Sequence, residues 1–341
     1  MFNIVIALVP VIVFLAALVL MDRFKMVRPS SVLLALAAGA GAAFLSLGLN
    51  DWLLHVQHIT PRVVSRYIAP IAEETAKALF IVALVAAGRI GFPVDAAVQG
   101  FAVGTGFALI ENLSYLRSMP AASPAVWIVR GLGTAVLQGT TTMIFAMISK
   151  TLSDRRQRRW ILAFVPGWTA AVVIHSTFNH RVLPPLAQTL LLLIGLPLLA
   201  LWVFDRSERA TREWVGAGMD LDIELLNLVG SEHFGVTHFG RYLQQLRAHT
   251  PGPIVADMFC LLRLELELSV QAKALLMARE AGLELPADDD LEAILAERRY
   301  LHQSIGKPGM LALKPLGITS HRDQWHRHLL QQRRARTGAG G

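Results

Sequence analysis

Long apolar blocks alternate with short polar segments through the first 204 residues of the chain. Most blocks are close to the roughly 20 residues that an α-helix needs to cross the hydrocarbon core of a bilayer. The first block has no basic segment before it and is followed by Asp22 and Arg23, which favours a membrane span over a cleaved signal peptide. The pattern therefore predicts seven transmembrane helices, at residues 2–20, 31–49, 67–87, 95–116, 126–148, 160–179 and 184–204.

The pattern changes after residue 204, where the chain becomes polar and rich in charge. Pro253 stands at a first-turn position, a Leu-rich stretch follows to about Ala281, and Gly282 is a stop signal. A second tail helix is predicted from the Asp288–Asp290 run to Ile305, where Gly306 ends it. We therefore expect an all-α protein with two domains, a transmembrane helical bundle at 1–204 and a small helical domain at 205–341.

Composition supports this division and limits the function. Hydrophobic residues make up 54% of the chain, charged residues only 17%, and the mean hydropathy is +0.48, which a soluble protein would struggle to present to water. Residues 1–204 hold 15 Lys and Arg against 7 Asp and Glu, whereas residues 205–341 hold 17 against 18. The excess positive charge thus lies in the membrane half, so we expect no nucleic-acid partner. A single cysteine, Cys260, excludes an internal disulfide and a Cys-based zinc site.

The loops between the predicted spans differ sharply in basic residues. One side of the membrane has twelve, at 23, 25, 28, 89, 150, 155, 156, 158, 159, 206, 209 and 212, and the other has four, at 62, 66, 117 and 181. Basic loops stay in the cytoplasm. We therefore expect a multi-pass protein of the cytoplasmic (inner) membrane, with its N-terminus outside and its C-terminal domain in the cytoplasm.

The third and fourth predicted spans contain charged residues. The third span carries Glu73, Glu74 and Lys77, and the fourth carries Glu111 followed by Asn112. An ionisable group in hydrocarbon costs at least about 2.5–3.5 kcal/mol, so these side chains must face the bundle interior and have partners. Lys77 follows the two glutamates by four and three residues and can pair with either. We expect a structural ion pair that leaves the other carboxylate free.

The polar residues of the third, fourth and sixth spans lie at similar depths below the outer face of the membrane, although these helices run in opposite directions. Glu73 and Glu74 lie about six residues, or roughly 9 Å, below the outer edge of the third span. Glu111 and His175 lie about five residues from the outer edge of the fourth and sixth spans, and Asn179 shares a helix face with His175. The sequence therefore predicts one polar cluster near the outer face.

Such a cluster can perform amide hydrolysis in two ways. A buried carboxylate can take a proton from water while His175 and Asn179 donate hydrogen bonds to the oxyanion. Alternatively, Glu74, Glu111 and His175 can hold a divalent metal such as zinc, whose bound water attacks the substrate. The residues alone do not decide between these two mechanisms, so the cofactor stays open.

Other classes of function fit the same residues. Intramembrane carboxylates also bind a proton or a cation in transporters and sensors, and a Glu–Lys pair can be purely structural. The inner halves of the third and sixth spans carry essentially no polar residues, and the fourth carries Asp95 and Gln99 near its inner end, whereas a transporter needs a polar path across the membrane. This favours a peptidase over a transporter. In a third interpretation, the protein is a scaffold whose cytoplasmic helical domain carries the function. The charged cluster would then be dispensable.

Three segments resemble the motifs of a known family. Residues 73–77 (EETAK) resemble an EExxK motif, residues 107–112 (FALIEN) an FxxxEN motif, and residues 175–179 (HSTFN) an HxxxN-type motif. Together and in this order they resemble the PrsW family of intramembrane proteases, which is distantly related to the CAAX prenyl endopeptidases. The resemblance covers about residues 65–180, and the tail resembles nothing known.

The resemblance implies a peptidase that cleaves membrane-anchored proteins near the extracytoplasmic face within the lipid bilayer. The family's named substrate is an anti-sigma factor. Carried over to this sequence, Glu73 and Glu74 are the catalytic pair, Glu111 and His175 complete the site, and Asn179 assists.

The sequence departs from the family pattern at one place. Relatives often carry a histidine in the fifth span where this chain has Gln138. Glutamine is a poor zinc ligand. The departure therefore favours water activated by a glutamate with no metal.

Overall fold

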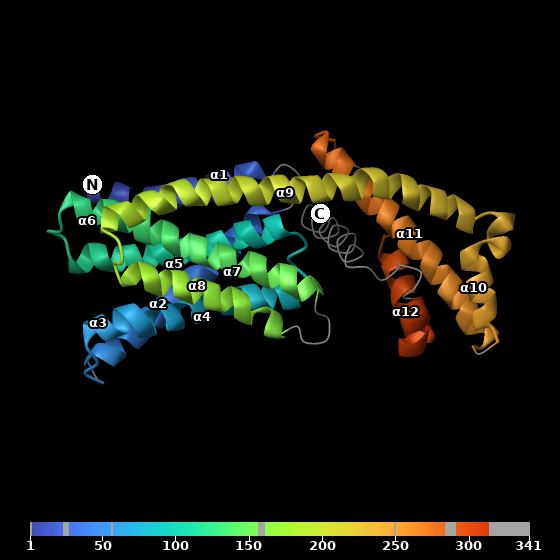
Figure 1. The fold of residues 1–341 in the computed structure, drawn as a ribbon, viewed down its shortest axis with the longest axis horizontal. Helices are drawn as coiled ribbons and strands as arrows, with labels where there is room; N and C mark the ends of the chain where they lie inside the picture. Colours follow the sequence, from blue (N-terminus) through green and yellow to red (C-terminus); the bar gives the residue numbers. More distant parts are fainter. Residues whose placement is uncertain are drawn as a thin grey trace. The chain divides into compact units, whose positions relative to one another are not determined.

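The computed structural model describes residues 2–22, 27–55, 57–155, 161–248, 250–283 and 291–313. Every regular element in these ranges is helical, so the predicted all-α class is confirmed (Figure 1). The chain divides into two compact units, Met1–Ser207 and Glu208–Gly341, which are described separately. The boundary lies within one helix, α9 (Pro185–Val229).

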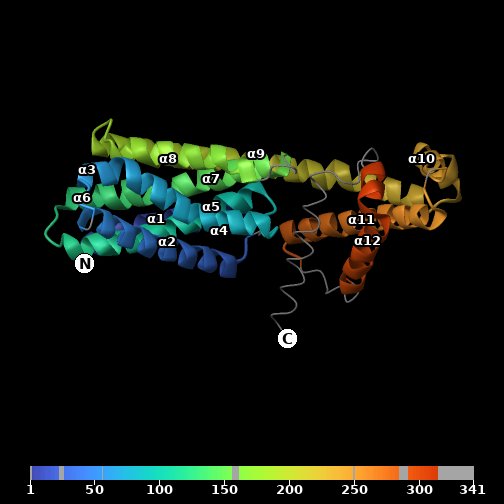
Figure 2. The same cartoon turned by 90° about the horizontal axis from the view of Figure 1, so that it is seen from below.

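The helices of the first unit run side by side (Figures 1 and 2). They are α1 (Phe2–Met21), α2 (Pro29–His55), α3 (Pro61–Val63), α4 (Ala69–Ala86), α5 (Pro93–Ser118), α6 (Pro124–Ile128), α7 (Ala135–Arg155), α8 (Val165–Asn179) and the first part of α9. Two π-helical segments, η1 (Val64–Ile68) and η2 (Val129–Thr134), join α3 to α4 and α6 to α7. Single turns of π-helix occur frequently at functional sites.

Six helices among the described residues are long and apolar enough to cross a membrane: Phe2–Met21, Pro29–His55, Pro93–Ser118, Pro124–Asp154, Ile161–Asn179 and Pro185–Val229. The chain is thus a multi-pass membrane protein. The third predicted span is not among the six, because α4 carries three charged residues in its 18 residues. Helical structure nevertheless begins at Pro61, earlier than predicted, and α4 packs against α2, α5, α7 and α8. We therefore propose α4 as the seventh span.

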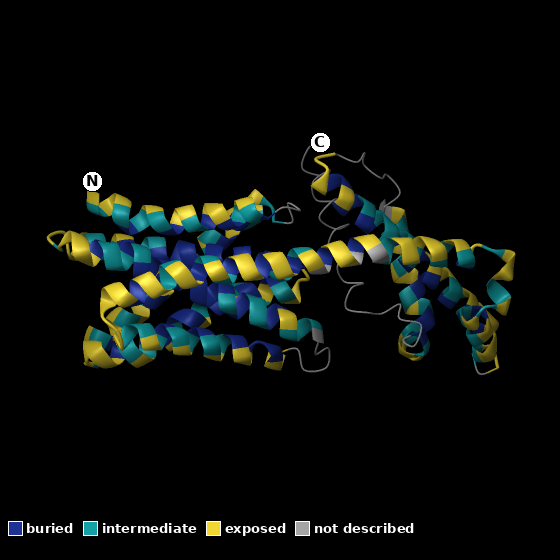
Figure 3. Cartoon of the chain, turned by 45° about the horizontal axis from the view of Figure 1, so that its top comes forward, coloured by how far each residue is buried: buried dark blue, intermediate teal, exposed yellow. Residues whose placement is uncertain are grey.

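Helix α5 forms the centre of the first unit. Its residues are buried without interruption from Val94 to Ala108, whereas α1, α2 and α9 expose apolar side chains on their outer faces (Figure 3). A Cβ atom on Gly104 would lie 2.1 Å from the carbonyl oxygen of Gln138, and one on Gly106 would lie 2.0 Å from that of Leu36. The glycines therefore bring α7 and α2 into contact with the backbone of α5, as close helix packing in membranes requires.

The second unit is also helical. It contains the end of α9, η4 (Glu232–Val236), α10 (His238–Leu246), α11 (Gly252–Glu280) and α12 (Leu291–Leu313). Gly282 follows α11 with φ of +73°, so the first predicted stop signal is confirmed. Gly306, with φ of +63°, interrupts α12 without ending it, because the element continues to Leu313, which corrects the predicted end at Ile305. The predicted Asp288–Asp290 start lies outside the described residues. Helix α9 continues past residue 204 to Val229, which corrects the predicted end of that element.

Candidate active site

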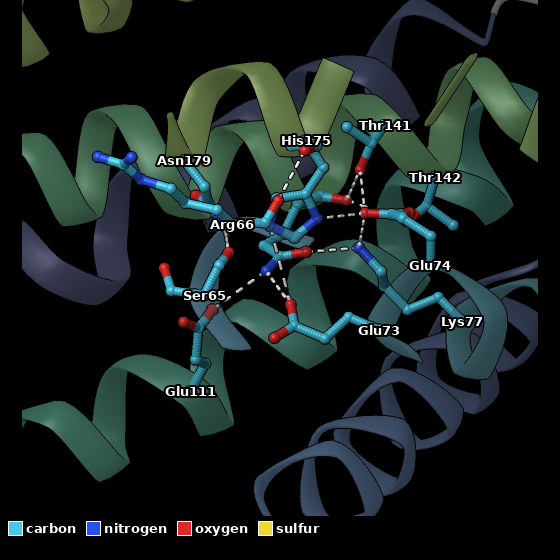
Figure 4. A network of polar contacts seen from close by, with 12 residues as sticks. Ser65, Arg66, Glu73, Glu74, Lys77, Glu111, Thr141, Thr142, His175 and Asn179 are labelled. Carbon is cyan, nitrogen blue, oxygen red and sulfur yellow. Dashed lines mark hydrogen bonds and ion pairs between the residues drawn. The ribbon is translucent and has the colours of Figure 1, made fainter. Parts of the chain in front are cut away.

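A buried ion pair in the first unit joins Lys77 to the second glutamate of the motif. Lys77 Nζ donates to Glu74 Oε1 at 2.7 Å, and the two side chains are 0% and 2% exposed (Figure 4). The ammonium group also lies 5.0 Å from the centre of the Phe107 ring. Charge this deeply buried needs a partner of opposite sign, and the i, i+3 spacing on α4 provides one.

The same oxygen of Glu74 accepts two further hydrogen bonds. Thr141 Oγ1 on α7 donates at 3.0 Å, and His175 Nδ1 on α8 lies at 2.7 Å. A carboxylate paired with a lysine only accepts, so we assign the proton of the imidazole to Nδ1. His175 Nε2 then carries the lone pair, and it lies 3.9 Å from Glu73 Oε2. Glu74 therefore orients the histidine towards Glu73.

Gln138 on α7 connects the remaining carboxylates to this core. Its Oε1 accepts from Lys77 Nζ, while its Nε2 donates to Glu73 Oε2 at 3.0 Å and to Glu111 Oε2 at 3.2 Å. The residue is 1% exposed. An amide suits this place because it offers one acceptor oxygen and two N–H donors on adjacent atoms. Neutral imidazole, with one donor and one acceptor, could not make all three contacts.

Glu111 has a second partner that sequence reasoning missed. Arg130 Nη2, on η2, lies 3.0 Å from Glu111 Oε1, and Arg130 Nε donates to Asn112 Oδ1 at 3.1 Å. Asn112 Nδ2 in turn donates to the carbonyl oxygen of Ala7 at 2.7 Å. The signal was available, because Arg130 is a charged residue inside the predicted span 126–148. Thr141 was missed as well, since a threonine inside a helix commonly bonds its own backbone.

Asn179 lies beside the cluster and makes a different contact. Its Nδ2 donates to the carbonyl oxygen of Ser65 at 2.9 Å, and Ser176 Oγ donates to that of Arg66 at 2.7 Å (Figure 4). Both carbonyls belong to η1. Within the described part of the chain, no hydrogen bond joins Asn179 to a carboxylate of the cluster. The two side chains hold α8 to η1 at the edge of the site.

The donor set does not fit a divalent metal. No group of three or more His, Cys, Asp or Glu side chains in the described ranges is arranged to hold one. Of the predicted ligands, Glu74 and His175 bond each other, while Glu111 contacts Gln138 and Arg130. The cation that pairs with Glu74 is the ammonium group of Lys77 and not a metal ion. These contacts occupy donor atoms that a metal would need.

Buried carboxylates that flank a histidine within a bundle of membrane-crossing helices fit an intramembrane hydrolase. The chain matches the PrsW family of intramembrane metalloproteases over residues 28–203 and belongs to that family, which confirms the resemblance carried by the three motifs. It is therefore a peptidase that acts on substrates embedded in the membrane. No curated protein and no solved structure matches the chain.

Proposed function

We propose that this protein hydrolyses peptide bonds of membrane-anchored proteins near the extracytoplasmic face, with water activated by Glu73 and no metal in the reaction. The supporting observation is the difference between the two adjacent glutamates. Glu74 Oε1 accepts from three side chains, whereas within the described ranges Glu73 accepts from Gln138 alone and only at Oε2. Among the described residues, no donor reaches Glu73 Oε1. A carboxylate with unused acceptor capacity can take a proton from water.

The neighbouring histidine supports the same assignment. With its proton on Nδ1, His175 presents a lone pair at Nε2, and this atom lies 3.9 Å from Glu73 Oε2. A water molecule that donates one hydrogen to His175 Nε2 and the other to the Glu73 carboxylate would direct its oxygen lone pairs away from both groups. Water held in this way is oriented for attack, which is the usual role of a general base and its partner.

The proposed reaction is direct hydrolysis. The water oxygen attacks the carbonyl carbon of the substrate, and the water proton passes to Glu73. The oxyanion then re-forms the carbonyl group as the carbon–nitrogen bond breaks, and Glu73 returns the proton to the departing nitrogen, which leaves one carboxylic acid and one amine. The Asn179 amide has a second N–H besides the one given to Ser65, and we propose it as a donor to the oxyanion. Glu111 and Gln138 hold Glu73 in position.

The proposal also includes the side of the membrane on which the cut is made and the type of substrate. The imbalance of basic loops supports an outer position for the site and a cytoplasmic position for the second unit, in the inner membrane. The family resemblance suggests an anti-sigma factor or a similar membrane-anchored regulator as the substrate.

Comparing membrane-protein fragments in cells that produce the wild type or a variant tests the proposal. We expect Glu73→Gln to abolish the fragments at normal abundance of the protein, because an amide cannot accept the proton. Asp51→Asn is a matched control, since Asp51 is an exposed carboxylate at the end of α2. Should Glu73→Gln release the same fragments as the wild type, this mechanism is wrong, and proton or cation binding by the cluster becomes the better explanation.

A further inference from the structure

Arg130 is a charged residue of the first unit that the proposed reaction does not use. Its side chain is 13% exposed. Nη2 contacts Glu111 Oε1 at 3.0 Å, Nε donates to Asn112 Oδ1 at 3.1 Å, and the guanidinium carbon lies 3.5 Å from the centre of the Tyr115 ring. Two hydrogen bonds along the edge of the guanidinium and an aromatic ring on its face fix both the position and the plane of the group.

The contact with Glu111 reaches the proposed base through one further side chain. Glu111 uses Oε1 for Arg130 and Oε2 for Gln138, whose Nε2 lies 3.2 Å from Glu111 and 3.0 Å from Glu73. One amide nitrogen therefore lies between two carboxylates. Arg130 neutralises one of them and holds it against the amide. Without the guanidinium, Glu111 would lose its cation and would be free to turn away from Gln138.

The other end of the arginine is fixed to the first helix of the chain. Asn112 bonds both Arg130 and the carbonyl oxygen of Ala7 on α1. Gly131, next to Arg130, lets η2 touch the same helix, because a Cβ there would lie 1.8 Å from the carbonyl oxygen of Ile6. Helix α1 lies outside the matched residues 28–203. It nevertheless contributes to the support of the site.

We propose that Arg130 is a positioning residue, which holds the Glu111 carboxylate so that Gln138 keeps Glu73 in place for the activation of water. This inference rests on the proposed function. The residue does not touch the reacting atoms, and its effect passes through Glu111 and Gln138.

Substitutions of Arg130 test the proposal. The readout is the set of membrane-protein fragments that wild-type cells release and cells without the protein do not. We expect Arg130→Met to lower their release about tenfold to hundredfold at normal abundance, because small displacements of a catalytic group have effects of this size. Arg130→Lys should also lose about tenfold, since an ammonium group lacks the fixed fork that contacts Glu111 and Asn112 together. Arg117→Met, at an exposed arginine near the end of α5, should cleave like the wild type.

A chemical rescue separates positioning from a merely structural role. In isolated membranes that contain Arg130→Ala, guanidinium at concentrations well below those that denature should restore part of the cleavage, and the same concentration of sodium chloride should not. Loss of cleavage without this rescue would show that Arg130 only supports the fold, and the inference would be wrong.

Two further outcomes are decisive. If either Arg130→Met or Arg130→Lys cleaves as well as the wild type, the inference is wrong. If Arg130→Met does not accumulate in the membrane, the result for Arg130→Lys alone tests the inference. Glu73→Gln, measured alongside, separates the two levels of argument. If Glu73→Gln is inactive while the arginine variants are active, only the role of Arg130 is wrong. If Glu73→Gln is active, the proposed function itself fails.

Discussion

Lys77→Met should destabilise the protein because it leaves a buried carboxylate without its cation. Lys77 is 0% exposed, and its Nζ lies 2.7 Å from Glu74 Oε1. Breaking a buried ion pair by removing one partner costs about 3–5 kcal/mol. Thr141 and His175 still donate to Glu74, so we expect a loss near the lower end, about 3 kcal/mol.

Thermal unfolding in a mild detergent measures this loss. For a folded unit of about 200 residues, about 3 kcal/mol corresponds to a decrease of roughly 6–12 °C in the unfolding midpoint. The double variant Lys77→Met/Glu74→Gln removes both charges and should recover most of the stability, because neutral replacement of a buried pair costs little. Leu79→Met is the control, since Leu79 lies on the same helix and is exposed. Neither the single nor the double variant should cleave.

Two results would refute this reasoning. An unchanged midpoint for Lys77→Met would show that the ion pair contributes nothing to stability. A double variant less stable than the single one would show that the uncompensated charge is not the cause. The loss would then come from contacts of the lysine side chain itself, such as the one with the Phe107 ring.

Two other predictions concern topology and metal content. Cys260, the single cysteine, is exposed on α11, so an impermeant maleimide should label it only after the cells are permeabilised. A cysteine placed at the exposed loop residue Ala121, in a Cys260→Ser background, should be labelled in intact cells, and labelling of Cys260 from outside would reverse the orientation. Active purified protein should contain no stoichiometric zinc, because Glu74 and His175 bond each other and Gln138 is a poor ligand. Zinc at one equivalent that disappears in His175→Ala would restore a metal mechanism.

The fold could be predicted largely from hydropathy, and the errors in the predicted helix boundaries have a common cause. Apolar stretches mark the part of a helix that lies within the membrane, and they do not mark where the helix begins or ends. Helix α9 therefore extends to Val229, far beyond the apolar block that ends at residue 204. In the same way, helical structure begins at Pro61, in a polar segment that precedes the third predicted span. Nothing in the hydrophobic pattern predicts the π-helical segments η1 and η2.

The membership of the site could be predicted better than its contacts. Charge is so costly in hydrocarbon that charged residues inside a span stand out. The spacing allowed Lys77 to pair with either glutamate, however. Glu74 is the partner, and Thr141 and His175, from two other helices, donate to the same oxygen. Asn179 contacts a backbone carbonyl, and a contact of this kind has no sequence signal.

Gln138 explains how the site can keep three carboxylates together without three cations. Its amide accepts from Lys77 and donates to both Glu73 and Glu111, so one neutral side chain connects a cation to two anions. A metal ion would draw the same carboxylates together by its charge, and a histidine at this position would serve as one of its ligands. An amide at this position holds the carboxylates together but is a poor ligand for a metal. The glutamine therefore fits a site in which hydrogen bonds, Lys77 and Arg130 perform the ordering that a metal would otherwise provide.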